Sequence, residues 1–125
     1  MGTFRVIFVN YFDHFGVVMK ASKHWTLQRL TAILLLPLSY WILEFLRFAL
    51  NANYFEIIEW LSAPLNKMAL IAWFLVVFYH ATIGLQVVLE DYISNTQKQL
   101  AAIWTAHSIF AGLGLSAVIL LLQIR

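Results

Sequence analysis

The sequence predicts an all-α membrane protein with three transmembrane helices, and three observations support that prediction. Of the 125 residues, 62% are hydrophobic and 11% are charged, which is unlike a soluble globular domain. Three apolar segments, over residues 30–50, 65–89 and 101–123, are each near the roughly 20 residues that cross a bilayer core of about 30 Å. No charge interrupts the chain between Lys67 and Glu90. A soluble helical core would need polar helix faces, which these segments lack.

The chain divides into an N-terminal arm and a membrane anchor. Residues 1–29 form an N-terminal amphiphilic arm, which we expect at the membrane interface or against a partner, or else as a partly ordered tail. The anchor then occupies residues 30–125, and Pro37 predicts a kink or a break within its first span. We expect a loop over residues 51–64 and a short polar connection over residues 94–99. Small residues in the third span allow close helix packing in lipid.

The distribution of basic residues predicts the orientation. Five lie on the side of the N-terminus and of the 94–99 connection, and three lie on the other: Arg5, Lys20, Lys23, Arg29 and Lys98 against Arg47, Lys67 and Arg125. By the positive-inside rule, the N-terminus is cytoplasmic or in the matrix. The N-terminal residues resemble neither a signal peptide nor an Arg/Ser-rich transit peptide. We therefore expect the bacterial inner membrane, with the mitochondrial inner membrane as the alternative.

Several classes of function are excluded by what the sequence lacks. With no cysteine, the chain cannot provide thiolates to an iron–sulfur cluster, attach haem covalently or form a disulfide. It contains neither a GxGxxG nor a P-loop pattern. A formal charge of +2 without a dense basic run gives no indication of nucleic-acid binding.

His80 is the first candidate site residue, because an ionisable side chain inside a membrane span is costly and needs a specific partner. It could ligate haem iron, pair with a polar group on a neighbouring helix, or lie in a hydrated cavity. Gly84, one turn later on the same side, would leave room for a flat macrocycle. His107 is the other histidine within a span, but it is expected nearer the cytoplasmic end of the third span, where an interhelical hydrogen bond is the favoured role. We therefore expect any second haem ligand to come from a partner.

Asp91 and Tyr92 are the second candidate site, at the end of the same apolar run. At about 100° per residue, Asp91 lies within roughly 20° of the face of His80 and about 16 Å further along the helix. One interpretation is an interfacial tyrosine beside a solvated carboxylate. The other is a quinone head-group site, since quinone reduction requires protons and a phenol can donate a hydrogen bond.

His24 and Arg29 lie where the chain enters its first span. Basic side chains at this depth commonly extend toward lipid phosphates. Their alternative partners are haem propionates, which the planar guanidinium of Arg29 would bind well.

Two segments together resemble the hydrophobic membrane anchor subunit of succinate dehydrogenase, also called complex II. HATIGLQVVLEDY, residues 80–92, is similar to that family's HxxxG…DY signature, and SKHWTLQRLTAILLLPL, residues 22–38, is similar to its entry into the first span. The resemblance covers roughly residues 22–94. The second signature is fairly specific, because a ligand, a glycine, an acid and a tyrosine follow in order at fixed offsets.

The resemblance implies specific roles and partners. His80 would be one axial ligand of a b-type haem, and a companion membrane subunit, the cytochrome b subunit, would supply the other. Tyr92, with Asp91 beside it, would bind ubiquinone, while Arg29 and His24 would approach the haem propionates. FAD and iron–sulfur clusters would reside in a flavoprotein subunit and an iron–sulfur subunit. The chain would be half of a heterodimeric anchor, without catalysis of its own.

Three other functions remain open on the sequence. The anchor of a quinol:fumarate reductase would run the same couple in reverse. A haem-free structural membrane subunit would use His80 only for an interhelical bond. A small proton-coupled transporter is disfavoured, because the spans offer no mid-membrane acid for a relay.

Overall fold

The computed structural model describes the backbone of residues 2–124 and the side chains of residues 22–124. Its elements are four helices: α1 (Gly2–Ala49), α2 (Tyr54–Ser62), α3 (Pro64–Tyr92) and α4 (Thr96–Gln123). Three segments are long and apolar enough to cross a membrane: Ser22–Ala49, Pro64–Tyr92 and Thr96–Gln123. The predicted all-α fold with three spans is therefore confirmed.

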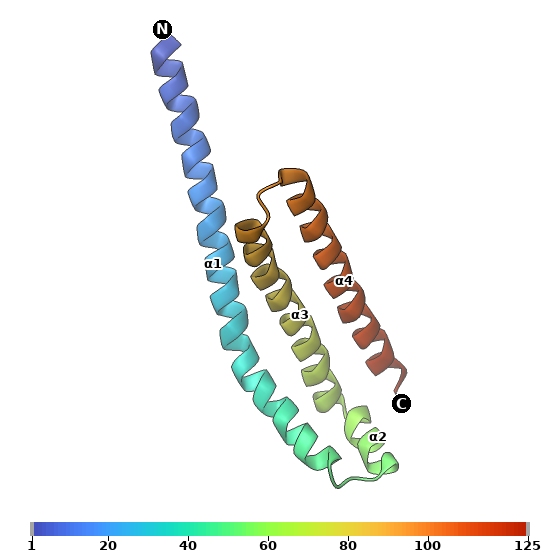
Figure 1. Ribbon diagram of the computed structural model, residues 1–125. Coiled ribbons are helices and arrows are strands. Elements are labelled where there is room, and N and C mark those ends of the chain that lie inside the picture. The colour runs from blue at the N-terminus through green and yellow to red at the C-terminus, as the bar shows by residue number, and fades with distance from the viewer. Residues whose placement is uncertain (1, 125) are drawn as a thin grey trace.

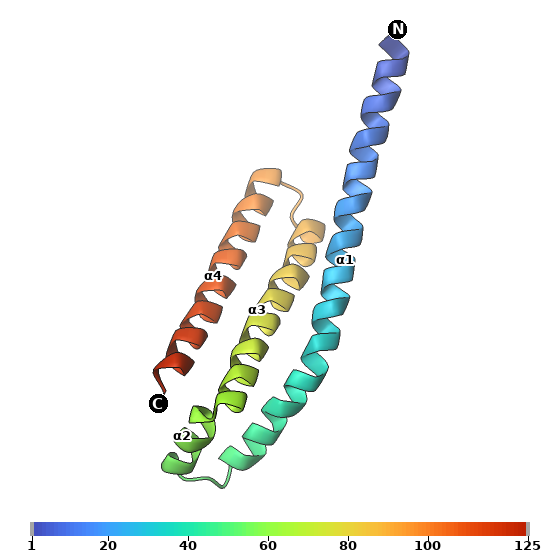
Figure 2. The ribbon, with the colours of Figure 1, turned by 180° about the vertical axis from the view of Figure 1, so that it is seen from behind.

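The three long helices stand side by side in a row with α3 in the middle (Figures 1 and 2). Helix α3 packs against both α1 and α4. Along the helix axes, the α3–α4 connection lies at one end of the three helices, and α2 and the C-terminus lie at the other end (Figure 1). Tyr92, the last residue of α3, therefore lies at the end of the three helices opposite to α2.

Helix α2 corrects the expectation of a loop over residues 51–64. Asn53 and Glu56 form a capping box: the Asn53 side chain accepts from the backbone N–H of Glu56, and the Glu56 carboxylate accepts from the N–H of Asn53. The ring of Trp60 packs against Phe45 and Phe48 near the end of α1, with centroid distances of 4.6 and 6.4 Å. The capping box and these ring contacts explain why this short amphipathic segment folds as a helix.

The spans are longer than the apolar runs that predicted them. Pro64 occupies the first turn of α3, where its missing N–H costs nothing. The side chain of Asn95 caps α4 by accepting from the N–H of Lys98 at 3.1 Å. Helices α3 and α4 thus begin before the predicted apolar segments at residues 65 and 101.

Helix α1 continues through Pro37, so the predicted break does not occur. The ribbon bends in its second half, which fits the alternative of a kink (Figure 1). The backbone also continues without interruption across the expected boundary at residue 29. The interfacial placement expected for the arm depends largely on side chains 1–21, which lie outside the described residues.

Helices α1 and α3 are joined by two hydrogen bonds between their side chains. The indole N–H of Trp73 donates to Ser39 Oγ at 3.2 Å, and Thr31 Oγ1 lies 2.7 Å from His80 Nδ1. The partner on α1 moves back from Ser39 to Thr31 as the residue on α3 moves forward from Trp73 to His80. This order shows that α1 and α3 pack antiparallel. Two polar contacts in an apolar environment therefore fix how α1 is aligned with α3.

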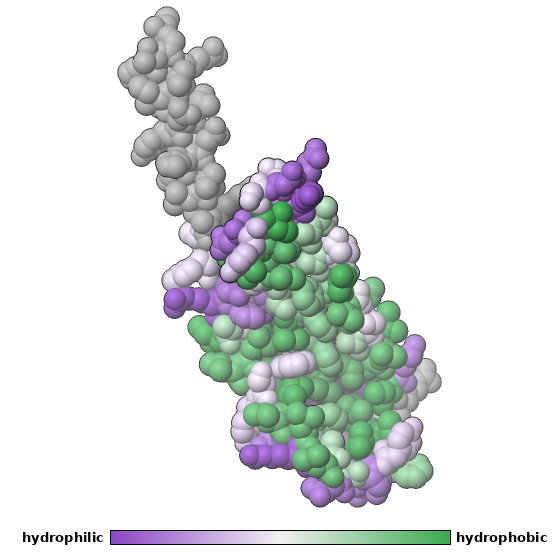
Figure 3. Space-filling view, in the orientation of Figure 1, coloured by the Kyte–Doolittle hydropathy of each residue, from purple (hydrophilic) through white to green (hydrophobic). Residues whose placement is uncertain are grey.

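Most of the apolar surface remains uncovered within this chain. The buried hydrophobic side chains of the described region are Leu70, Ile83 and Leu121. In the most apolar 18-residue window of each span, the buried shares are 0%, 17% and 11% in chain order. Figure 3 shows hydrophobic residues over the middle and hydrophilic residues toward both ends of the described surface. Such a belt matches a protein whose sides face lipid or other membrane helices.

Gly84 allows α1 to approach α3 closely, so a large side chain there should separate them. A Cβ at this position would lie 3.0 Å from Gln28 Nε2, the flexible end of a side chain. We expect Gly84→Ala to be tolerated and Gly84→Leu to destabilise the fold by about 1–3 kcal/mol, the usual cost of overpacking. Thermal unfolding in detergent would measure this.

Gly112→Leu is the matched control for Gly84→Leu. A Cβ at Gly112 meets nothing within 4 Å, so the same added volume should cost little. Equal losses of stability in both leucine variants would contradict the close approach at Gly84.

Candidate functional site

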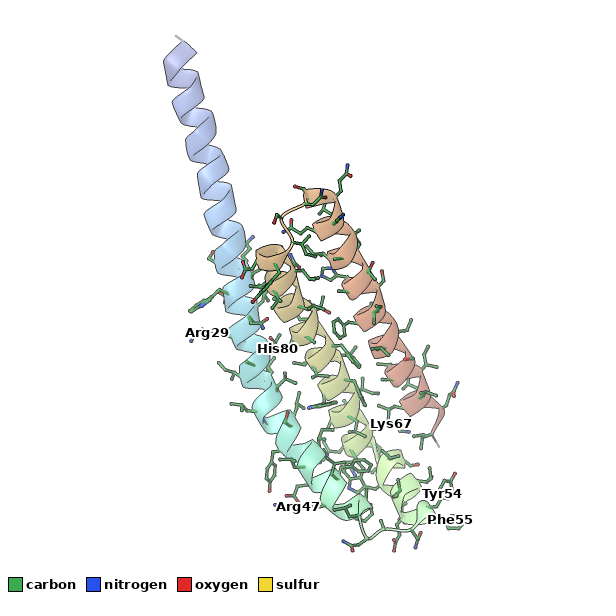
Figure 4. The ribbon with its side chains drawn as sticks, viewed as in Figure 1. Arg29, Arg47, Tyr54, Phe55, Lys67 and His80 are labelled. Carbon is green, nitrogen blue, oxygen red and sulfur yellow. The ribbon has the colours of Figure 1, made fainter. Side chains whose placement is uncertain are left out.

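His80 lies at the contact between α1 and α3 (Figure 4). Its ring nitrogen Nδ1 is 2.7 Å from Thr31 Oγ1. The side chain of His80 is half-buried, and Thr31 is 7% exposed. The same Thr31 hydroxyl lies 2.8 Å from the carbonyl oxygen of Leu27 and 3.1 Å from that of Gln28. The imidazole therefore has a defined polar partner within the chain, one of the situations expected for an intramembrane histidine.

The side of α3 at Gly84 is occupied by Gln28 of α1, whose amide lies close to the glycine. That Gly84 leaves room for a flat macrocycle therefore stays a prediction, and in the described chain α1 lies against this side of α3. Gln28 Oε1 is buried without a hydrogen-bond partner in the described region. Gly84 brings α1 near enough for Thr31 to reach His80.

His24 and His107 lie apart from this contact and line one cavity of about 600 Å³. The cavity walls come from α1, α3 and α4, and are largely apolar side chains such as Phe78 and Phe110. Gln86 adds a further polar group. The structure thus brings together two histidines that the sequence placed in separate roles, and His80 does not line this cavity.

Arg29 extends from α1 away from α3, on the outer side of the row (Figure 4). Its guanidinium lies 4.3 Å from the ring centroid of Trp25, in a cation–π contact. Within residues 22–124, the ion pair is Arg47–Glu44, so Arg29 has no described carboxylate partner. The structure does not bring Arg29, His24 and His80 together as one cluster.

Asp91 and Tyr92 lie at the end of α3 with exposed side chains, and Tyr92 is 84% exposed. Within residues 22–124 neither side chain makes a hydrogen bond. The neighbouring Glu90 is held instead: Gln86 donates to its carboxylate at 2.8 Å, and Gln99 of α4 donates to its carbonyl at 3.0 Å. The end of α3 is thus fixed, while the Tyr92 hydroxyl remains available for a ligand or partner.

Comparison with known proteins decides the family. Residues 10–121 match the model of the succinate dehydrogenase/fumarate reductase transmembrane subunits. The chain belongs to that family. A relative from Rickettsia bellii (strain RML369-C), a succinate dehydrogenase hydrophobic membrane anchor subunit, is 43% identical over 79 residues. That match covers 63% of this chain and 63% of the relative.

A relative with the same description from Rickettsia felis (strain URRWXCal2) is 40% identical over 88 residues, or 66% of this chain and 72% of that protein. The match to the Rickettsia bellii protein, in contrast, spans a little under two thirds of that protein's length. No solved structure matches it. The region that matches the family model contains both His80 and Tyr92.

The residues present allow a test of whether a haem of the type expected for this family fits. The described residues contain no group of three or more metal-binding side chains, so they do not form a metal site by themselves. A bis-imidazole haem needs only one imidazole from each of two chains. A half-buried histidine with one nitrogen already bonded fits that requirement.

Sequence reasoning missed the roles of Gln28 and Thr31, although both lie in the segment that resembles the entry of this family into its first span. Each is a polar residue within the apolar span Ser22–Ala49. Their offset of three positions places both on one helix face. That shared face was the available signal of a polar contact with another helix.

Proposed function

We propose that the chain is the hydrophobic membrane anchor subunit of a succinate:ubiquinone oxidoreductase, which links the tricarboxylic acid cycle to the respiratory chain. One observation supports this most directly. The uninterrupted helix α3, inside the region that matches the family, carries a half-buried His80 within the span and an exposed Tyr92 at its end.

His80 is proposed as one axial ligand of a haem b shared with a second anchor subunit. A bound haem would supply one-electron redox chemistry within the membrane. The imidazole of His80 would hold the iron from this chain's side, while the cytochrome b subunit provides the other ligand. The exposed surface of the row leaves area for such a partner to pack against.

Tyr92 and Asp91 are proposed to form one wall of the ubiquinone site. The phenol of Tyr92 would donate a hydrogen bond to a quinone carbonyl, and Asp91 would hold that phenol or pass protons to it. Their exposure at the helix end suits this role, because the protons must come from water at the membrane edge.

Arg29 and His24 are proposed to assist with the haem propionates. Arg29 is exposed and has no described carboxylate partner, so its charge is available to an anionic group. His24 lines the cavity shared with His107, and its contribution would require a propionate to reach that side of α1.

The proposed complex places this chain in the bacterial inner membrane with its N-terminus in the cytoplasm. A flavoprotein subunit with FAD and an iron–sulfur subunit would dock on the side of Tyr92 and deliver electrons from succinate. The chain alone would have no catalytic activity, since its sequence has no cysteine to hold a cluster and no GxGxxG pattern.

Gentle affinity purification of the tagged chain from its native membranes tests the proposal. We expect three proteins to come with it in equal amounts: a flavoprotein, an iron–sulfur protein and another small membrane protein. An unrelated membrane protein with the same tag controls for carry-over. Recovery of the chain alone, after crosslinking in intact membranes, would contradict the proposal.

The purified complex also separates the remaining functions by assay. Ubiquinone reduction by succinate supports the proposed direction. A preference for fumarate reduction with menaquinol would assign the chain to a quinol:fumarate reductase, which the matched family also includes. The absence of a low-spin haem spectrum would favour a haem-free structural role.

A further inference from the structure

We propose that Thr31 is a positioning residue that holds His80 in the tautomer with Nδ1 protonated and Nε2 free to bind iron. This inference rests on the proposed haem-ligand role of His80. It goes further by naming the ring nitrogen that faces the metal and the residue that selects it.

The hydrogens available at this contact determine the tautomer. Thr31 Oγ1 lies 2.7 Å from His80 Nδ1 and 2.8 Å from the carbonyl oxygen of Leu27, with the carbonyl oxygen of Gln28 further away at 3.1 Å. Each of the two shorter contacts needs a hydrogen between its two electronegative atoms. The carbonyl has none to give, so the hydroxyl hydrogen of Thr31 must point to Leu27. The hydrogen in the other contact must then come from His80 Nδ1.

A neutral imidazole protonated at Nδ1 has its lone pair on Nε2. That lone pair is what a haem iron requires. A metal-binding histidine commonly donates its second N–H to an oxygen, which fixes the ring and makes the ligand more basic. Thr31 supplies that oxygen from a neighbouring helix.

The residues around Thr31 and His80 stabilise the hydrogen bond between them. Thr31 is 7% exposed, so water has little access to compete for the Nδ1–H. Its hydroxyl is anchored by its own helix through Leu27. The Trp73–Ser39 hydrogen bond and the close approach of Gln28 to Gly84 hold α1 against α3 on either side of the contact. The orientation of the imidazole is therefore set by how these two helices pack.

Thr31→Val and Thr31→Ser, each made in the assembled complex, test the inference. Valine keeps the shape of threonine but offers no acceptor to Nδ1–H. We expect Thr31→Val to lower haem affinity by about tenfold, the smaller loss typical of removing such a partner. The ferric low-spin electron paramagnetic resonance signal should also shift, because the imidazole plane is no longer fixed. Thr31→Ser retains the hydroxyl and should restore both properties.

The haem midpoint potential gives a readout that general destabilisation would not reproduce. A less basic imidazole stabilises ferric iron less, so the potential of Thr31→Val should rise. If the affinity for ferric haem falls tenfold more than the affinity for ferrous haem, the one-electron midpoint potential rises by about 59 mV. Subunit stoichiometry, measured on the same samples, would show that the complex is still assembled.

Thr82→Val is the matched control. Thr82 is also buried, at 8% exposure, but among the described residues its hydroxyl bonds to the carbonyl of Phe78 in its own helix, at 2.7 Å, and to no residue of another helix. Its replacement should leave the midpoint potential and the resonance signal unchanged. A Thr31→Val complex with the haem properties of the parent would overturn the inference. In that case His80→Ala separates two explanations. If His80→Ala also keeps the parent spectrum, His80 is not a haem ligand. If His80→Ala loses the spectrum, His80 is a ligand and only the positioning role of Thr31 is contradicted.

Discussion

Replacing His80 with alanine is expected to remove the low-spin haem spectrum of the assembled complex. Alanine offers no nitrogen to the iron, and His24 and His107 line a cavity that His80 does not. The loss of haem affinity should exceed the about 10–100-fold that follows from removing only an outer hydrogen-bond partner of a metal ligand. Absorbance difference spectra of reduced and oxidised complex, normalised to flavin content, would measure it.

His107→Ala is the matched control for this experiment. His107 is also half-buried in a membrane helix, but it lines the cavity between the helices and not the α1–α3 contact. The haem spectrum of that variant should be unchanged. A parent-like spectrum in His80→Ala would contradict the ligand role, and equal losses in both variants would indicate a general defect of packing.

Tyr92→Phe is expected to reduce ubiquinone reduction by about 100-fold, the lower end of what a positioned proton donor contributes. Phenylalanine retains the ring at the membrane edge but removes the hydroxyl. Electron transfer from succinate to an artificial soluble acceptor should stay near the parent rate, because that route would bypass the proposed quinone site. The ratio of the two activities isolates the effect.

Tyr54→Phe provides the comparison at the opposite end of the row (Figure 4). Tyr54 is 70% exposed and Tyr92 is 84% exposed, so the same atom is removed from a similarly accessible ring. Tyr54→Phe should change neither activity. Equal loss of both activities in Tyr92→Phe would point to failed assembly and would contradict a specific role in quinone binding.

The spans and their order could be predicted from the sequence because the bilayer imposes a simple length requirement. An uncharged run such as that between Lys67 and Glu90 has few alternatives to a membrane helix. The ends were less predictable, because caps such as Asn95 extend a helix beyond its apolar run. Helix α2 was missed although Asn53 and Glu56 have capping-box spacing, since their polarity equally suits a loop.

The local part of the candidate site could also be predicted, while its contacts between helices could not. Helical phase alone relates His80 to Asp91 along α3. The contact of His80 with Thr31 joins residues 49 positions apart and depends on how α1 is rotated and aligned against α3. The same rotation brings Gln28 against Gly84, a contact that helical phase within α3 could not predict.

The row arrangement of α1, α3 and α4 has a consequence for cooperativity. Because α3 is the shared neighbour, most contacts among the three long helices fall into two interfaces, α1–α3 and α3–α4. Opening one interface therefore leaves the other largely intact, as in linear repeat proteins. A partner that covers the face of all three helices would couple these two openings into one, and hydrogen exchange would show a single transition only after assembly.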